Sequence, residues 1–344
     1  MKACIFHEPG RISVEEVPDP RPGPGEVLLK VGATSICYSD IRVYKGLKKA
    51  RPGVIPGHES AGTVAAVGPG VEAFGEGQRL VICPILACGE CYYCLQGKRN
   101  RCLARRTLGY EEDGGLAELM LLPRRLVELG HLLPVPEGLA LERACLTEPT
   151  ACALNSLETC RVGPGGSLAI IGAGPMGLTH LLLARTMGVS RILVSEPVAE
   201  RREYARRWGA SRVVDPASEN LPRAALELSD GLGVDAAILT IGAGGLVPET
   251  IGLVRRQGYV MLFAGFPADS SVPLDPNLIH YDELHLTGTQ NATPEQYRRA
   301  LHLLTLTPEM DGLITHRFAI QEASKAYETR LAGQGLKSVV VFEG

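Results

Sequence analysis

The opening part of the chain alternates short apolar runs with Gly and Pro. Residues 26–31 and 62–68 are two such runs, and in the turn at residues 21–25 Pro and Gly alternate after Arg21. Because Pro fixes φ and Gly adopts left-handed backbone, this pattern predicts short strands joined by turns. The strand-like pattern returns at 114–135 after a weakly periodic stretch at 83–107. The first 150 residues therefore predict a β-rich, barrel-like domain that carries one long loop.

Strands and helices alternate along the middle of the chain. Runs typical of buried strands stand at 167–171, 192–194, 213–214, 234–239 and 259–264, with helical stretches after residue 177, at 198–208 and at 247–256. This alternation predicts a parallel sheet with right-handed crossovers. From about residue 285 the pattern is mixed, and it ends in the strand-like run 337–342. We therefore predict an α/β protein in which a doubly wound domain, residues 151–284, is inserted into a β-rich domain formed by residues 1–150 and 285–344.

Composition narrows the class of protein. The chain has 344 residues, a net charge of −3 and no block of like charge, which argues against a nucleic-acid-binding surface. No stretch approaches the roughly 18 apolar residues of a membrane span, and the amino-terminal text does not resemble a signal peptide. We expect a cytoplasmic protein with no membrane partner, in which clustered cysteines bind metal rather than form disulfides.

Four of the ten cysteines stand close together in the weakly periodic loop. Cys88, Cys91, Cys94 and Cys102 have the spacing C-x2-C-x2-C-x7-C. Four thiolates satisfy the tetrahedral preference of zinc and leave no open coordination position, so this pattern predicts a structural zinc site. The alternatives are four unrelated loop thiols and an iron–sulfur cluster, although the spacing differs from the ferredoxin pattern.

A second set of metal-ligand residue types is scattered along the chain. It consists of Cys37, His58, Glu59 and Glu148. Cysteine, histidine and carboxylate are the ligands of a catalytic zinc, which keeps one position open for water or substrate. Taken alone, these four residues are also consistent with an alternative interpretation, in which they are a buried cysteine, a core histidine and two surface glutamates without a metal.

A glycine motif follows the predicted strand at 167–171 and opens a helix. Its members are Gly172, Gly174, Pro175, Met176 and Gly177. In this strand–turn–helix setting the pattern G-x-G-x-x-G predicts a dinucleotide-binding Rossmann domain, with the pyrophosphate at the helix N-terminus. Glu196 ends the second strand of the unit, where an acidic residue binds the hydroxyls of the adenosine ribose.

These motifs together resemble one enzyme family. The text Gly57-His58-Glu59, followed by Gly62, Gly68 and Val71, is similar to the G-H-E-x2-G-x5-G-x2-V signature of zinc-containing medium-chain dehydrogenases. The cysteine cluster resembles the structural-zinc lobe of that family, and the glycine motif follows in the expected order. The text around Cys37 and Glu148 is most similar to the polyol branch, which includes sorbitol, butanediol, threonine and cyclitol dehydrogenases. The resemblance covers essentially the whole chain and implies that the β-rich domain is GroES-like.

The resemblance also implies roles for single residues. Cys37 and His58 would be catalytic-zinc ligands, and Glu59 and Glu148 would be a direct ligand and a nearby or exchanging one, in an order that the sequence leaves open. Ser39 would pass on the proton of the substrate. The family's cofactor contacts would fall on Arg201, Phe266, Thr289 and Lys337.

Two positions depart from the family pattern. Tyr38 stands where the family often has Gly or Arg, and Arg42 stands where it often has the histidine that ends the proton relay. Because an arginine stays protonated, the relay must end elsewhere, at water or at the cofactor ribose. Arg42 is then available to contact the cofactor or an anionic or polar substrate.

The sequence as a whole predicts a dehydrogenase with two zinc ions per chain and NAD as cofactor. Its substrate would be a small alcohol or polyol, bound between the two domains, and the chain would form a homo-oligomer, a tetramer or a dimer. Two alternatives are a zinc-independent enzyme of quinone-reductase type and a non-catalytic NADH-binding protein. The set of Cys37, His58 and Glu148 argues against the first.

Overall fold

The structure, a computed structural model, describes residues 1–342 and divides the chain into two compact units. Unit 1 comprises Met1–Ala151 together with the chain from Ala292 onward, and unit 2 comprises Cys152–Asn291. The second boundary lies beyond the expected residue 284, because the strand β15 (His285–Gly288) pairs with unit 2. The α/β fold class with a Rossmann sheet and a separate β-rich domain is confirmed.

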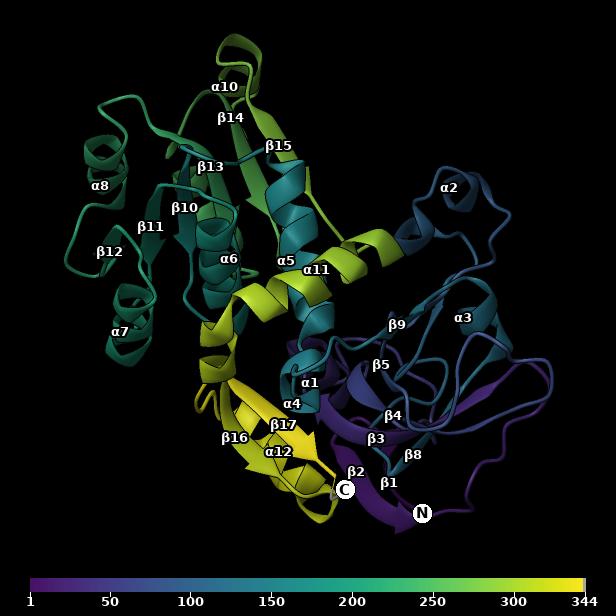
Figure 1. The fold of residues 1–344 in the computed structure, drawn as a ribbon. Coiled ribbons are helices and arrows are strands. Elements are labelled where there is room, and N and C mark those ends of the chain that lie inside the picture. Colours follow the sequence, from purple (N-terminus) through teal and green to yellow (C-terminus); the bar gives the residue numbers. More distant parts are fainter. Residues whose placement is uncertain (343–344) are drawn as a thin grey trace. The chain divides into compact units, whose positions relative to one another are not determined.

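Unit 2 is built on a six-stranded sheet in the order β12-β11-β10-β13-β14-β15, in which every neighbouring pair is parallel (Figure 1). The strands are β10 (Ser167–Ile171), β11 (Arg191–Ser195), β12 (Arg212–Val214), β13 (Val234–Leu239), β14 (Val254–Leu262) and β15. The helices are α6 (Pro175–Thr186), α7 (Ala199–Arg207), α8 (Leu221–Leu228), α9 (Val247–Ile251) and α10 (Pro276–Tyr281), and α5 (Thr147–Thr159) runs into the unit from unit 1. This strand order reverses at β10, which places the first βα turn at the switch point where doubly wound folds bind nucleotides.

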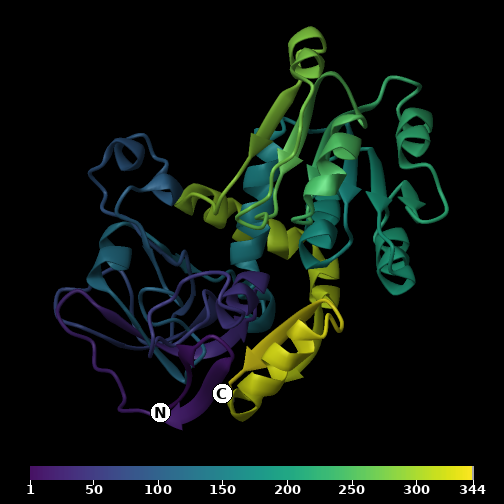
Figure 2. The same ribbon diagram turned by 180° about the vertical axis from the view of Figure 1, so that it is seen from behind.

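Helices cover both faces of this sheet, as the two opposite views show (Figures 1 and 2). The central strand β10 is buried at every position, which is the pattern of a strand covered on both sides. On one face α8 and α9 bury Leu221, Val247 and Ile251 against the sheet. The two central strands are therefore held rigidly, and so is the turn that follows β10.

Unit 1 is built on a sheet in the order β16-β17-β3-β4-β5-β9, with β8 beside β3. Its strands are β3 (Val27–Ser35), β4 (Glu59–Val67), β5 (Arg79–Ile82), β8 (Leu119–Leu122), β9 (Leu132–Pro134), β16 (Ile314–Phe318) and β17 (Lys337–Val341). All pairs are antiparallel except β16 with β17. The pairing of β17 with β3 joins the end of the chain to its beginning, so unit 1 is one domain in spite of the insertion.

Smaller elements complete unit 1. They are the hairpin β1 (Lys2–Glu8) and β2 (Arg11–Glu16), the pair β6 (Ile85–Leu86) and β7 (Arg106–Thr107), and the helices α1 (Tyr38–Tyr44), α2 (Tyr92–Leu95), α3 (Arg124–Glu128), α4 (Leu141–Ala144), α11 (Pro294–Leu306) and α12 (Ala323–Leu331). Short 3₁₀ turns of unit 1 lie at Arg99–Arg101, Pro308–Leu313 and Ile320–Glu322, and another in unit 2 lies at Gly244–Leu246. Helix α12 packs on β16 and β17 and buries Tyr327 in the core that Ile36 and Ile41 share.

The helix expected over 247–256 is too long. Helix α9 ends at Ile251, and β14 begins at Val254, which pairs with Val234 of β13. The backbone leaves the regular ladder just after this pair, where Gln257 has a positive φ of 60°. Within residues 1–342, no helix combines the length and apolar character that a membrane crossing needs.

Candidate active site

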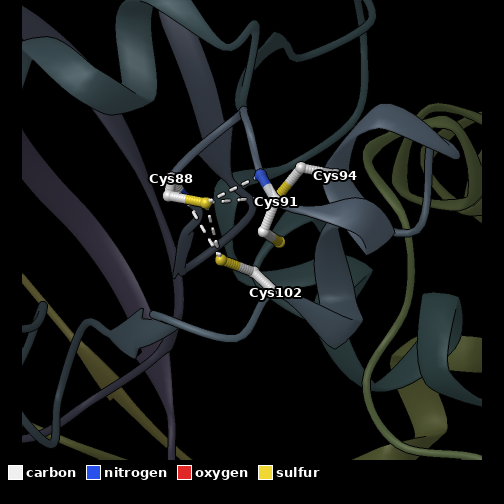
Figure 3. A group of neighbouring side chains, drawn as sticks. All are labelled: Cys88, Cys91, Cys94 and Cys102. Atoms are coloured by element: carbon white, nitrogen blue, oxygen red, sulfur yellow. Dashed lines mark hydrogen bonds between the residues drawn. The ribbon is translucent and has the colours of Figure 1, made fainter.

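The four cysteines of the loop at 83–107 converge on one centre (Figure 3). Cys88 Sγ lies 3.5 Å from Cys102 Sγ and 3.9 Å from Cys94 Sγ. Four thiolates bound at about 2.3 Å to one tetrahedral zinc would lie about 3.8 Å apart, so these separations fit a common ion. The backbone N–H of Cys91 donates to Cys88 Sγ at 3.4 Å, and that of Cys88 to Cys102 Sγ at 3.2 Å, as expected around thiolates.

The surroundings of these thiols favour a cation. Backbone N–H donors lower the pKa of Cys91 to about 6, whereas burial raises the pKa of Cys94 to about 12. Neighbouring thiols in one pocket therefore resist joint ionisation unless a positive charge compensates them. The donor set and its spacing fit zinc, with the loop held by the short helix α2 and the 3₁₀ turn at Arg99–Arg101.

A second group of ligand atoms comes together in unit 1. The donor atoms of Cys37, His58 and Glu59 all lie within 4.8 Å of one another. Cys37 is the N-cap of α1, and His58 and Glu59 stand at the start of β4, which pairs with β3 through Glu59 and Ser35. Strand pairing thus brings together residues that are about twenty positions apart in sequence.

An orphaned oxygen marks this group as a cation site. Glu59 is fully buried, and its Oε1 has no hydrogen-bond partner within the described residues. A buried carboxylate oxygen without a donor is costly unless a cation or a proton satisfies it. A thiol, an imidazole and this oxygen are the donor types of a catalytic zinc, so the residues present fit the ion.

The other oxygen of Glu59 is occupied. Its Oε2 accepts a hydrogen bond of 2.5 Å from Nζ of Lys337, and the two side chains are 0% and 4% exposed. Burial opposes a charge on Lys337, but Glu59 outweighs it and raises the pKa of that lysine. The sequence predicts Lys337 as a pyrophosphate contact, whereas here its ammonium lies inside unit 1 on a candidate metal ligand. That placement does not favour the predicted role.

Asp40 orients the histidine, and the sequence reasoning missed it. Its Oδ1 lies 3.2 Å from Nδ1 of His58, and its Oδ2 accepts the backbone N–H of Cys37 at 2.9 Å. Burial opposes protonation of His58, but the Asp40 carboxylate outweighs it and raises the pKa of His58 well above its usual value. A carboxylate behind a ligating histidine fixes the ring and increases its basicity. The spacing Cys37-x2-Asp40 at a helix start was the signal for this residue, since an acidic side chain at that position caps the helix.

Ser39 has a partner that sequence reasoning also missed. Its Oγ lies 2.6 Å from the hydroxyl of Tyr110 and 3.5 Å from Nε2 of His58. The Tyr110 hydroxyl is in turn 3.1 Å from Nδ1 of His58, and burial raises the pKa of Tyr110 well above its usual value. Nothing in the sequence joins Tyr110 to Ser39, because 71 residues separate them.

The remaining residues predicted for this site do not join the group of converging ligand atoms. Glu148 is buried in the first turn of α5, but it is not a member of the group of converging ligand atoms among residues 1–342. Its charge acts on Tyr110, so it lies in the same neighbourhood. Arg42 is half-buried at the end of α1, and Tyr38 is exposed.

The glycine motif in unit 2 forms a tight strand-to-helix turn. Gly172 follows β10 with a φ of +99°, and Gly177 packs so closely that a Cβ there would lie 1.8 Å from the Gly172 carbonyl oxygen. Gly174 is the N-cap of α6, Pro175 and Met176 form its first turn, and a Cβ on Gly174 would meet nothing within 4 Å. The turn therefore leaves open space beside free backbone N–H groups, which suits a pyrophosphate.

Glu196 lies at the carboxyl end of β11, next to this turn. Its Oε2 accepts from the backbone N–H of Ala173 at 2.6 Å, and its Oε1 from that of Val198 at 2.9 Å. The side chain is 3% exposed, so these two bonds hold the carboxylate in one orientation. Arg202 pairs with Asp215 and donates to the Glu196 carbonyl oxygen.

Three other predicted cofactor residues also lie in unit 2. Arg201 is half-buried in α7. Phe266 packs partly buried against the core of the sheet, and the Thr289 hydroxyl contacts the sulfur of Met261 at 3.8 Å. All three follow or precede the carboxyl ends of sheet strands, the edge at which Rossmann domains bind their cofactor.

A Rossmann unit joined to a β-rich unit with a closed four-cysteine site and an open Cys–His–Glu site defines a zinc-dependent dehydrogenase of the alcohol type. Family models agree with this class: the alcohol dehydrogenase GroES-like domain matches residues 23–135, and the zinc-binding dehydrogenase domain matches residues 175–305. The chain belongs to the family of zinc-containing medium-chain dehydrogenases, in the branch of the polyol and threonine dehydrogenases.

Individual relatives support this assignment over the full length. The L-threonine 3-dehydrogenase of Pyrococcus horikoshii is 33% identical over 100% of this chain and 99% of its own. The sorbitol dehydrogenase of Halalkalibacterium halodurans is 30% identical over 98% of each. Among solved structures, a zinc-binding dehydrogenase of Sinorhizobium meliloti 1021 bound to NADP superposes with a TM-score of 0.93 at 31% identity, covering 99% of both chains.

Proposed function

We propose that this protein oxidises a secondary alcohol or polyol, or reduces the corresponding ketone, with zinc at Cys37 and His58 and with NAD as the hydride carrier. The observation that carries the proposal is the convergence of Cys37, His58 and Glu59 around an orphaned carboxylate oxygen. Relatives named for threonine and sorbitol support an alcohol substrate that bears further polar groups.

Zinc bound here would supply a Lewis acid that lowers the pKa of a substrate hydroxyl, and NAD would accept the hydride. Cys37 and His58 are the principal ligands, with Asp40 holding the imidazole. Glu59 is the third ligand through its free Oε1, while Lys337 retains Oε2. Glu148 remains the exchanging ligand.

Ser39 takes the proton of the substrate hydroxyl at its Oγ. The Tyr110 hydroxyl, 2.6 Å away, receives the next hydrogen bond of this path. Tyr110 thus extends the path from Ser39, and the proton finally passes to water or the cofactor ribose, because Arg42 stands where the family often has the histidine that ends the relay. Because burial raises the pKa of Tyr110, its hydroxyl stays protonated and relays a proton without ionising.

NAD binds to unit 2 through the glycine turn and Glu196. The backbone N–H groups at the start of α6 receive the pyrophosphate, and the fixed carboxylate receives the ribose hydroxyls. Arg201, Phe266 and Thr289 complete the site near the adenosine and nicotinamide ends. Lys337 contributes through Glu59 rather than by a phosphate contact.

Three further assignments belong to this proposal. Residues 1–151 with the chain from 292 form the catalytic domain, and residues 152–291 form the cofactor domain. The protein resides in the cytoplasm, since all ten cysteines are free thiols, as a reducing compartment maintains them. It assembles as a tetramer or a dimer, which sedimentation equilibrium measures directly.

The test is a screen with NAD against secondary alcohols, polyols, cyclitols and threonine. We expect turnover with at least one class, and we expect Cys37→Ala and His58→Ala each to retain less than about a hundredth of it, a barrier increase above about 2.7 kcal/mol. NADH binding, followed by its fluorescence, should be unchanged in both variants. Cys4→Ala, which removes a buried thiol of unit 1 outside both clusters, is the matched control and should stay active. Turnover in the absence of Cys37 and His58 would instead favour the zinc-independent quinone-reductase type.

A further inference from the structure

A run of cations without carboxylate partners begins in the last turn of α1, whose N-cap is Cys37, and continues beyond its end. Within residues 1–342, no carboxylate forms an ion pair with the side chains of Arg42, Lys45, Lys48 or Lys49. Arg51, two positions further on, shows the contrast, since it pairs with Asp113 at 2.8 Å. A protein with a net charge of −3 therefore concentrates uncompensated positive charge in eight residues next to its candidate active site.

One member of this run lies on the site itself. Nζ of Lys48 stands 3.3 Å above the centroid of the Tyr110 ring, and the hydroxyl of that ring binds Ser39 and faces His58. A single aromatic ring thus separates the ammonium from the candidate zinc ligands. Burial lowers the pKa of Lys48, and the negative groups that oppose this effect are Asp40, Cys37, Glu111 and Glu148.

The ammonium has hydrogen-bonding capacity that the protein leaves unused. It carries three N–H donors, and the face of a ring satisfies at most one direction. Lys48 as a residue is exposed, so a bound molecule reaches it from solvent, although its ammonium lies against the ring of the buried Tyr110. Among the groups of a small substrate, a negatively charged oxygen pairs best with such a cation.

We propose that Lys48, seated on Tyr110, binds an oxyanion of the substrate, a carboxylate or a phosphate ester, while the hydroxyl to be oxidised lies at Ser39. Arg42 adds a second positive charge, since it lies one turn after Ser39 on the same helix and its carbonyl accepts the Lys48 backbone N–H at 3.2 Å. This inference rests on the proposed dehydrogenase activity and narrows its substrate to hydroxy acids, amino acids or polyol phosphates.

Two matched pairs of substrates test the proposal. 2-Butanol and 3-hydroxybutyrate differ by a terminal carboxylate, and sorbitol and sorbitol 6-phosphate differ by a phosphate ester. We expect kcat/KM to be higher for the charged member of at least one pair, and the identity of that pair distinguishes carboxylate from phosphate. Increasing salt should reduce this advantage, because the attraction is electrostatic.

The variant Lys48→Met keeps an apolar side chain on the ring and removes the charge. Lys48→Met should lower kcat/KM for the charged substrate about tenfold or more, mainly by raising KM. The same variant should change kcat/KM for the neutral substrate of the pair by less than about twofold. Lys48→Arg should restore most of the loss, and Lys49→Met, an exposed neighbour without a ring contact, is the matched control. Equal effects on both members of a pair, or no effect on either, would overturn the role of Lys48 and leave the dehydrogenase assignment intact. Absence of turnover with every alcohol in wild-type protein would instead refute the proposed function.

Discussion

The buried pair of Glu59 and Lys337 allows a quantitative prediction about the stability of unit 1. Lys337 is the one donor to Glu59 Oε2 among residues 1–342, so replacing it by Met leaves a carboxylate with 0% exposure beside an apolar side chain. In the zinc-free protein, removing one partner of this buried ion pair should cost about 3–5 kcal/mol, because the remaining charge is uncompensated. Replacing both partners costs far less, so Lys337→Met combined with Glu59→Gln should recover most of the loss.

The expected loss of unfolding free energy corresponds to a decrease in the melting temperature of unit 1. Unit 1 has about 200 residues, for which 1 kcal/mol corresponds to roughly 2–4 °C. We therefore expect the transition of unit 1 to fall by about 6–20 °C in Lys337→Met. The pKa of Lys337 is raised in the folded protein, so its pairing contributes fully below the unfolded pKa and is lost only as the pH rises through the higher folded value. Measurements at neutral pH thus capture the whole effect.

The assay separates the two units. Trp208 is the one tryptophan of the chain and lies in unit 2, so its fluorescence follows that unit, whereas circular dichroism follows both. Lys337→Met should shift the dichroism transition and leave the fluorescence transition near its wild-type temperature if the units melt separately. A shift below about 2 °C by dichroism, or a double variant no more stable than the single one, would refute the reasoning.

Three other predictions concern cofactor choice, metal and pH. Wild-type protein should prefer NAD to NADP in kcat/KM by about thirtyfold, because the fixed Glu196 carboxylate repels a ribose phosphate by roughly 2 kcal/mol, and Glu196→Ser should narrow the ratio. Zinc analysis should find two ions per chain. Brief chelation should remove the ion at Cys37 together with the activity, whereas the variant Cys88→Ser should lose the other ion. A single zinc in fully active protein would contradict this prediction. Burial lowers the pKa of His180 to about 4, so the unfolded state binds its proton first and stability falls as the pH drops from about 6.5 to 4. His180→Gln should reduce that loss by about 3 kcal/mol in unfolding followed by Trp208 fluorescence, and an unchanged acid limb would rule out the histidine as its source.

The parts of the site that depend on local spacing were predictable from the sequence. Cys88 to Cys102 lie in one loop, and Gly172 to Gly177 in one turn, so their geometry follows from a few backbone conformations. The Glu59–Lys337 pair joins residues 278 positions apart, and its existence depends on β17 pairing with β3. No local pattern encodes such a contact, and the resemblance to the family directed Lys337 to a different role.

The helices that were missed show a second limit. Helix α11 begins with Thr293, Pro294 and Gln296, a capping box with proline in the first turn, and this signal was present in the text. Helix α8 likewise starts at the cap Asn220 and is strongly amphipathic, but its eight residues are fewer than the window over which periodicity identifies a helix. Both helices therefore carried start signals that the search for hydrophobic periodicity did not use.

The hydrogen bond and the ion-pair contact made by Asp40 have a consequence for how this site tolerates sequence change. One oxygen closes the first turn of α1 at Cys37, and the other faces the imidazole of His58. Asparagine would keep the length but offer a single acceptor, and glutamate would keep the charge but overshoot both partners. In a saturation-mutagenesis library, position 40 should therefore tolerate almost no residue other than aspartate, although its side chain touches neither hydride nor substrate. A redesign of the pocket should accordingly transfer residues 37–40 together.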